Sequence, residues 1–210
     1  MNKFYTPLFD FFFGTHAGPR QAPTKVIVGL GNPGSHYAST RHNAGFWCVE
    51  RLAVDHRISF SRRHRTTSIG EGKINGHVVV LAKPRTFMNH SGEAVAYLMA
   101  RYKITANDLF VIYDDMSLSV GTLRVRPNGG GGGHKGVASI IDMIGTKDFP
   151  RLRIGIGHPK NDMDQVAYVL GTMPEDEKNK MDDAVTRASQ VVSSIMEDGI
   201  TVTMNQFNGT

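Results

Sequence analysis

Hydrophobic residues in the first half of the chain repeat with two different periods. Short apolar runs at 25–30 and 109–113 are typical of buried strands. Between them, apolar residues at helical spacing predict a helix over 43–56. Ser91 is placed to cap a second helix. The core face of that helix would consist of Ala94, Val95, Leu98, Met99 and Tyr102.

One hairpin interrupts this alternation, which then continues toward the end of the chain. Segments 66–74 and 77–82 flank the dipeptide Asn75-Gly76, which favours a two-residue hairpin turn. Further strands are predicted at 122–126 and 151–157, and further helices at 135–144 and 174–198, the last ending before Gly199. The pattern predicts a single α/β domain in which a mixed sheet lies between helices on both faces.

Composition agrees with one globular domain, which we expect at 25–208. The chain has 210 residues, of which 40% are hydrophobic and 20% are charged. Residues 1–24 predict an irregular N-terminal extension that lacks the continuous apolar core of a secretory signal. No apolar run approaches the roughly 20 residues that span a bilayer. We therefore expect a cytoplasmic protein that does not contact a membrane.

Charge and cysteine content narrow the classes of partner and site. A net charge of +5 is compatible with nucleic-acid binding but does not require it. Cys48 is the single cysteine, so an intramolecular disulfide and a multi-cysteine zinc site are excluded. Its position within an apolar helical pattern indicates a small buried residue and not a nucleophile.

The segment GLGNPG at 29–34 matches the glycine pattern of dinucleotide-binding proteins. That pattern requires a helix to begin within the glycines, so that its N-terminus meets a pyrophosphate. Here Pro33 and nine further residues precede the predicted helix. The acidic residue at about the expected distance, Glu50, lies inside that helix. We therefore reject a nicotinamide enzyme.

Polar side chains follow several of the predicted strands, where active-site groups collect in α/β sheets. They are His42, Asn89, Asp114 and His134. Each has an ordinary structural explanation by itself: a capping or core histidine, a helix start, a turn former and a surface side chain. Taken together, they are expected to converge on one cleft.

The chemistry of such a cleft is limited by the motifs that the sequence lacks. No Gly-x-Ser-x-Gly elbow supplies a nucleophile, and no His-Glu-x-x-His pair supplies a metal site. A water nucleophile, a histidine base, an orienting carboxylate and neutral amides remain. This set is suited to hydrolysis of an activated acyl bond such as an ester.

A run of glycines and two arginine pairs permit several interpretations. The glycines at 129–133 could cradle phosphate, form a flexible lid or allow a substrate to approach closely. Strand alternation places Arg124 with Arg126, and Arg151 with Arg153, on common faces that could hold phosphates or simply face solvent. The basic segment 62–65 is interpreted as an exposed loop.

Six blocks of the sequence together resemble the bacterial-type peptidyl-tRNA hydrolase family. The blocks are VGLGNPG, YASTRHNAGF, KPRTFMNHSGEAV, YDDMSL, GGHKG and RLRIGIGHP. They occur in the order and spacing of the family and span almost the whole chain from Lys25 to Asn208. The resemblance implies a single α/β domain with a twisted mixed sheet between helices.

The resemblance also implies roles for individual residues. His42 would be the base that activates water, and Asp114 the carboxylate that partners its imidazole. Asn32 and Asn89 would bind and position substrate and water. Substrate-binding roles are implied for Tyr37, Phe87, Met88, His134, Lys135, Arg124, Arg126 and Arg151.

Two positions depart from the family pattern. Lys135 stands where many members have asparagine, so water positioning in the cleft could differ. Ser117 replaces an aspartate that is usual after Asp114, at a turn or the rim. Neither change removes the proposed base, its partner or the two principal amides.

By this resemblance, the chain is expected to hydrolyse the ester between peptide and tRNA, recycling tRNA from prematurely released chains. The acceptor stem and 3′ end of peptidyl-tRNA would bind a monomer that needs no metal or organic cofactor. Two alternatives remain open. One is a non-hydrolytic RNA-binding relative of the splicing-partner type, and the other is a general small-ester hydrolase for which the arginine pairs are irrelevant.

Overall fold

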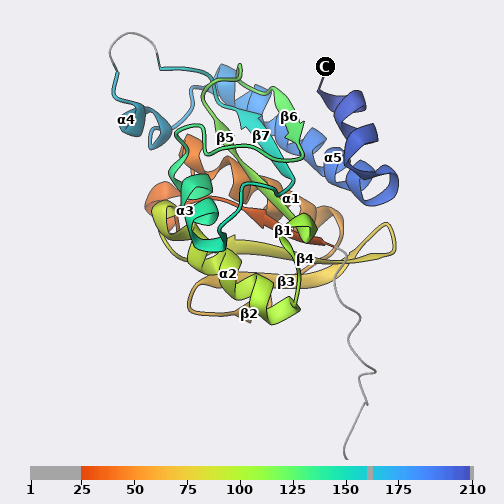
Figure 1. Ribbon diagram of the computed structural model, residues 1–210. Helices are drawn as coiled ribbons and strands as arrows, with labels where there is room; N and C mark the ends of the chain where they lie inside the picture. Colours follow the sequence, from red (N-terminus) through yellow and green to blue (C-terminus); the bar gives the residue numbers. More distant parts are fainter. Residues whose placement is uncertain (1–24, 160–162, 209–210) are drawn as a thin grey trace, which may run out of the picture.

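The fold centres on a seven-stranded sheet in the order β2-β3-β4-β1-β5-β7-β6 (Figure 1). It is seen in a computed structural model that describes residues 25–159 and 163–208. The expected extension at 1–24 therefore lies outside the described residues. Helices cover both faces of the sheet, so the predicted α/β architecture with a mixed sheet between helices is confirmed.

The middle of the sheet consists of parallel strands. β1 (Lys25–Gly29) lies between β4 (His77–Pro84) and β5 (Leu109–Asp115), and β7 (Arg151–Gly155) continues in parallel beside β5. Their apolar residues are buried on both faces, as expected for strands covered by helices on each side. The carboxyl ends of these strands point to the same edge, which is where the polar residues of the sequence lie.

Antiparallel strands complete both sides of the sheet. β3 (Thr67–Ile74) forms the predicted hairpin with β4, and β6 (Leu123–Arg126) pairs with β7. In the hairpin turn, Asn75 has φ 49° and Gly76 has φ 82°. Two successive positive φ angles match the turn that an Asn-Gly dipeptide favours.

The segment interpreted as an exposed loop contains a short edge strand, so that interpretation was wrong in part. β2 (Arg62–Arg63) pairs with β3. The ring of His64 then stacks on Tyr97 with a centroid distance of 3.6 Å. Two residues are too few for a strand period to be visible in the sequence.

Two helices pack on each face of the sheet. α1 (Ala44–Asp55) and α5 (Glu175–Phe207) cover one face, and α2 (Ser91–Tyr102) and α3 (Lys135–Ile144) cover the other (Figure 1). The remaining helix, α4 (Gln165–Val169), was not predicted. Among the described helices, none is long and apolar enough to cross a membrane.

The start of α2 and the end of α5 differ in detail from the sequence predictions. Ser91 does not cap α2 but is its first residue, and its hydroxyl donates to the carbonyl of Met88 at 2.8 Å. The backbone leaves helical geometry at Gly199, as predicted, with φ 79° and ψ 174°. Helical structure then resumes and continues to Phe207. The side chains of Met204 and Phe207 pack against the hydrophobic core, which stabilises this last segment.

The last helix also protects one edge of the sheet. The side-chain oxygen of Asn208 accepts a hydrogen bond from the Val125 amide at 2.7 Å, and its nitrogen donates to the Val125 carbonyl at 3.1 Å. The carboxamide thus occupies the outer edge of β6 as a neighbouring strand would, and covers backbone groups that could otherwise pair with another chain.

Candidate active site

A cavity of about 790 Å³ opens beyond the carboxyl ends of the central strands. Its lining includes all four polar residues that the sequence places after strands: His42, Asn89, Asp114 and His134. They arrive from the β1–α1 connection, the β4–α2 connection, the end of β5 and the residue before α3. The structure therefore brings these side chains into one cleft.

Glycines in the β1–α1 connection serve packing. A Cβ on Gly29 would lie 2.1 Å from the carbonyl oxygen of Gly45, and one on Gly45 would lie 2.3 Å from that of Ile112. The first turn of α1 can approach β1 and β5 this closely because both residues lack a side chain. The glycines therefore hold the start of α1 against the sheet.

A short 3₁₀ helix, η2 (Arg41–Asn43), carries the proposed base at the entrance to α1. The side-chain oxygen of Asn43 accepts a hydrogen bond from the Asn32 amide at 2.8 Å, and its nitrogen donates to the Asn32 carbonyl at 3.0 Å. Sequence patterns alone had indicated no separate role for Asn43. These paired bonds fix the loop that carries Asn32 beside His42.

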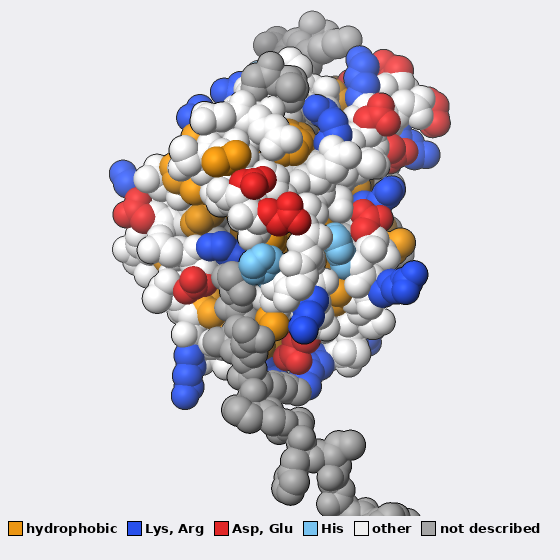
Figure 2. Space-filling view, turned by 90° about the vertical axis from the view of Figure 1, so that its right-hand side faces the viewer, with side chains coloured by type: hydrophobic (Ala, Val, Ile, Leu, Met, Phe, Trp, Pro, Cys, Tyr) orange, Lys and Arg blue, Asp and Glu red, His pale blue; other side chains and the backbone are white. Residues whose placement is uncertain are grey.

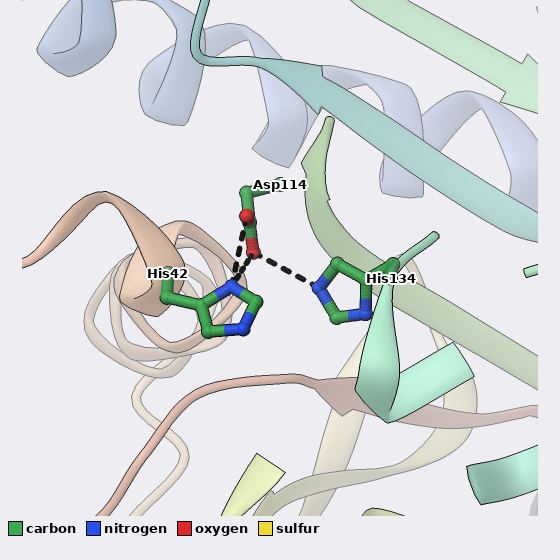
Figure 3. A group of neighbouring side chains, drawn as sticks. All are labelled: His42, Asp114 and His134. Atoms are coloured by element: carbon green, nitrogen blue, oxygen red, sulfur yellow. Dashed lines mark hydrogen bonds and ion pairs between the residues drawn. The ribbon is translucent and has the colours of Figure 1, made fainter. Parts of the chain in front are cut away.

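His42 and Asp114 form a buried pair at the floor of the cavity. Nδ1 of His42 lies 2.9 Å from each carboxylate oxygen of Asp114 (Figure 3). The two residues are 8% and 2% exposed. Because a carboxylate can only accept, Nδ1 carries a proton, and in the neutral ring Nε2 then keeps its lone pair. Nε2 has no partner among the described residues.

His134 is a second donor to the same carboxylate. Its Nδ1 accepts hydrogen bonds from the backbone amides of Gly136 and Val137 at 3.1 and 3.2 Å. The proton must therefore be on Nε2, which lies 3.1 Å from Oδ1 of Asp114. The rings of His134 and His42 are 4.9 Å apart and have opposite tautomers. His134 lines the cavity as expected, but its polar atoms face the protein.

The charge of Asp114 is stabilised by these neighbours. Burial by itself would raise the pKa of the carboxyl group. Electrostatic attraction to His42 and His134, together with their hydrogen bonds, outweighs burial and holds the pKa of Asp114 well below its usual range. Asp114 is thus an ionised acceptor at neutral pH and cannot itself serve as a proton donor.

The same three side chains are close enough to be tested as a metal site. Among the described residues, ligand atoms of His42, Asp114 and His134 lie within 4.8 Å of one another. A metal on Nε2 of His134 would need the lone pair of that atom. Nδ1 of the ring is already an acceptor for two backbone amides, so the ring would have to become an anion. The hydrogen bonds favour a proton network over a metal centre.

Two carboxamides face the cavity. The side-chain oxygen of Asn32 accepts from the amide of Met88 at 2.8 Å, which leaves its nitrogen as a donor without a described partner. Asn89 is exposed on the 3₁₀ helix η3 (Met88–His90), and its side chain has no described partner. Both amides are therefore available to a carbonyl oxygen in the cleft.

The rim is more exposed than the floor and includes an aromatic side chain. Phe87 is 56% exposed, and its ring contacts Tyr37 edge-on at a centroid distance of 6.1 Å. Tyr37 supports this rim without lining the cavity, whereas Met88 and Lys135 line it.

The wall contributed by α4 was missed. Gln165, Val166, Val169 and Leu170 line the cavity on this side. Asp164 offered one signal for this helix, since its side chain accepts from the Ala167 amide as an N-cap.

The two arginine pairs lie on one face of the sheet, because the register of β6 and β7 aligns Arg124 with Arg153 and Arg126 with Arg151. Arg126 is exposed, and Nε of Arg124 is buried without a described partner. Arg153 is paired with Asp115 and also donates to the hydroxyl of Ser117. None of the four is among the residues that line the cavity.

Arg151 is placed differently from the phosphate contact that the resemblance implies. It is 1% exposed, and its guanidinium donates to the carbonyls of Phe149, Gly130 and Lys147 at 2.7–3.3 Å. Its side chain therefore fixes the backbone at Gly130 of the glycine run, and its guanidinium is too buried to contact a phosphate. On the face drawn in Figure 2, other cationic side chains are interspersed with acidic ones.

Comparisons with known proteins identify the family. The family model described as peptidyl-tRNA hydrolase matches residues 26–210. A peptidyl-tRNA hydrolase of Dehalococcoides mccartyi is 46% identical over 187 residues, covering 88% of this chain and 99% of the relative. One from Chloroflexus aurantiacus is 47% identical over 184 residues, covering 87% and 98%. The crystal structure of peptidyl-tRNA hydrolase from Acinetobacter baumannii superimposes with a TM-score of 0.84 at 40% identity, covering 91% of this chain and 97% of that one. The chain therefore belongs to the peptidyl-tRNA hydrolase family.

Proposed function

We propose that this protein hydrolyses the ester bond of peptidyl-tRNA and that His42 activates the attacking water. The observation that carries the assignment is the bare Nε2 of an imidazole whose Nδ1 is held by a buried carboxylate. Family membership supplies the substrate class. A cavity that contains an oriented base and two amide donors favours an enzyme over a non-hydrolytic RNA-binding relative.

In the proposed reaction, Nε2 of His42 removes a proton from water as the oxygen attacks the acyl carbon. Asp114 stabilises the imidazolium that forms, and the imidazolium then protonates the 3′ oxygen of the departing ribose. Asn89 is our first candidate to bind the developing oxyanion, a role worth a factor of about 10²–10³. Asn32 would fix the peptide main chain, which suits a substrate whose peptide sequence varies.

The tRNA would be held mainly through its phosphates, with the unpaired 3′ end in the cleft. Exposed Arg126 and the cavity-lining Lys135 are available for this contact, and Arg124 presents a buried nitrogen that has no described partner. Phe87 on the rim and the buried side chain of Met88 would flank the ester. We propose that the protein acts as a monomer in the cytoplasm, where peptidyl-tRNA is released from ribosomes.

The decisive experiment compares wild-type protein with His42→Ala on peptidyl-tRNA, measuring binding and single-turnover cleavage separately. Cleavage should fall by at least about a hundredfold while binding persists. His77→Ala, on the hairpin away from the cavity, is the matched control. Cleavage by His42→Ala at the wild-type rate would refute the proposed base. Loss of binding without loss of single-turnover rate would assign His42 to substrate binding.

A small-ester hydrolase would respond differently to changes in the basic surface. Replacing Arg124 and Arg126 together by alanine should weaken tRNA-ester cleavage and leave a small activated ester unaffected. Equal rates of wild type and the double variant on peptidyl-tRNA would favour the small-ester alternative.

A further inference from the structure

Arg41 directly precedes the proposed base and is a buried cation outside its hydrogen-bond network. The residue is 7% exposed. Its guanidinium donates to Glu177 at 2.8 Å and to the carbonyl of Thr172 at 2.7 Å, and it lies 4.3 Å from the centroid of the Tyr168 ring. Nε has no partner among the described residues. Burial of a guanidinium is costly unless its geometry is well satisfied, so a simple space-filling role does not explain this choice of residue.

These partners belong to α4, to the segment between α4 and α5, or to the first turn of α5. The backbone joins the same region, because the amide of Arg41 donates to the carbonyl of Gly171 at 3.1 Å and Thr40 forms an isolated bridge with Thr172. α4 carries the wall of the cavity that includes Val166 and Leu170. Within η2, Arg41 therefore contacts the segment that forms this wall. The next residue, His42, is hydrogen-bonded to Asp114.

We propose that Arg41 is a positioning residue that couples the α4 wall of the cleft to the helix carrying His42. A cation with several directed donors can fix a carbonyl, a carboxylate and an aromatic ring at once, which no apolar side chain can do. The separation between base and wall is then set before substrate binds. His42 keeps its own anchors, Asp114 and the rest of η2, so loss of Arg41 should disturb the wall more than the base.

The test uses Arg41→Met in the full chain, with Arg51→Met as the matched control. Arg51 is exposed and pairs with Asp55 within α1. In Arg41→Met, amide hydrogen exchange in 163–172 should rise at least about tenfold, while exchange in β5 stays unchanged. KM for peptidyl-tRNA should rise about tenfold, with kcat within about threefold of wild type. The control should match wild type in both measurements.

The expected change in KM rests on the proposed function, whereas the expected change in hydrogen exchange does not. If wild-type protein fails to cleave peptidyl-tRNA, the proposed function falls and the exchange data still decide whether Arg41 holds α4. Unchanged exchange in 163–172 would overturn the coupling. Raised exchange with an unchanged KM, or exchange raised equally in β5, would reduce Arg41 to a general stabilising role and overturn the proposal.

A milder variant keeps the test open if Arg41→Met does not fold. Glu177→Gln removes one charged partner and leaves the contacts of Arg41 with Thr172 and Tyr168. We expect about a two- to threefold rise in KM and in exchange over 163–172. No change in either quantity would contradict the proposal.

Discussion

The floor and the rim of the cleft are built in opposite ways. On the floor, His42, Asp114 and His134 are buried and bonded to one another or to backbone amides. On the rim, Asn89 and Lys135 are exposed and have no described side-chain partner. The floor is therefore ordered before substrate arrives, whereas the rim retains its hydrogen-bonding capacity for substrate.

This difference separates two kinds of energetic contribution. Groups that are already oriented need no reorganisation when charge develops, so they contribute to the rate of the chemical step. Groups that are unpaired until substrate binds contribute to affinity, and to rate only where they meet charge that forms in the transition state. We expect floor variants to lower kcat and most rim variants to raise KM.

The largest effect is expected from Asp114→Asn. An asparagine in this position can donate its amide to Nδ1 of His42, which would place the proton on Nε2 and remove the lone pair that accepts from water. Single-turnover cleavage should fall by about 10³–10⁴-fold, with binding of peptidyl-tRNA little changed. A variant that keeps more than a third of wild-type kcat would show that the carboxylate does not set the tautomer.

A smaller effect is expected from Asn89→Ala on the rim. If Asn89 meets the developing oxyanion, kcat should fall by about a hundredfold, in spite of its exposed position. If it binds only the ground state, KM should rise and kcat should stay constant. Steady-state kinetics on peptidyl-tRNA distinguish these outcomes, and the second would assign the oxyanion to another donor.

A still smaller effect should distinguish the exposed arginine from its buried neighbour across the β6–β7 ladder. Arg126→Ala should weaken tRNA binding a few-fold and leave the midpoint of urea unfolding unchanged. The slope of log binding constant against log salt concentration should decrease by the amount expected for about one phosphate contact. Arg151→Ala should instead lower the midpoint of urea unfolding, because it removes the guanidinium that donates to three backbone carbonyls. A salt slope changed only by Arg151→Ala would reverse these roles.

The smallest effect concerns stability in acid. Because the folded pKa of Asp114 is held below its usual value, its charge stabilises the fold above the unfolded pKa of about 4. That contribution is lost as the pH falls through the folded pKa. The free energy of unfolding of wild type, measured relative to Asp114→Asn by urea titration, should therefore decrease below about pH 4. A relative increase on acidification would contradict the assigned shift.

Much of this architecture could be predicted from periodicity and from turn chemistry. The hairpin followed from Asn75-Gly76, and the convergence of His42, Asp114 and Asn89 followed from their positions after strands of one sheet. These features depend on local sequence and on the rule that parallel strands end at one edge. The structure bears out the placement of the elements, and the catalytic roles of these residues stay proposals.

Other features depended on contacts between distant segments. Strand alternation places Arg151 on a face of β7, but it does not show that the glycine run supplies carbonyls to that guanidinium. Likewise, backbone amides at the start of α3 determine the tautomer of His134. α4 was too short for a helical period to be visible, and Arg41 could be assigned no role until that helix was located.

The most direct measurement of the central claim is the tautomer of each histidine on the floor, obtained from long-range ¹H–¹⁵N NMR spectra at neutral pH. The signals of His42 and His134 can be assigned by their loss in His42→Asn and His134→Asn. We predict that His42 carries its proton on Nδ1 and that His134 carries its proton on Nε2. A proton on Nε2 of His42 in the free protein would contradict the assignment of this residue as the base that activates water.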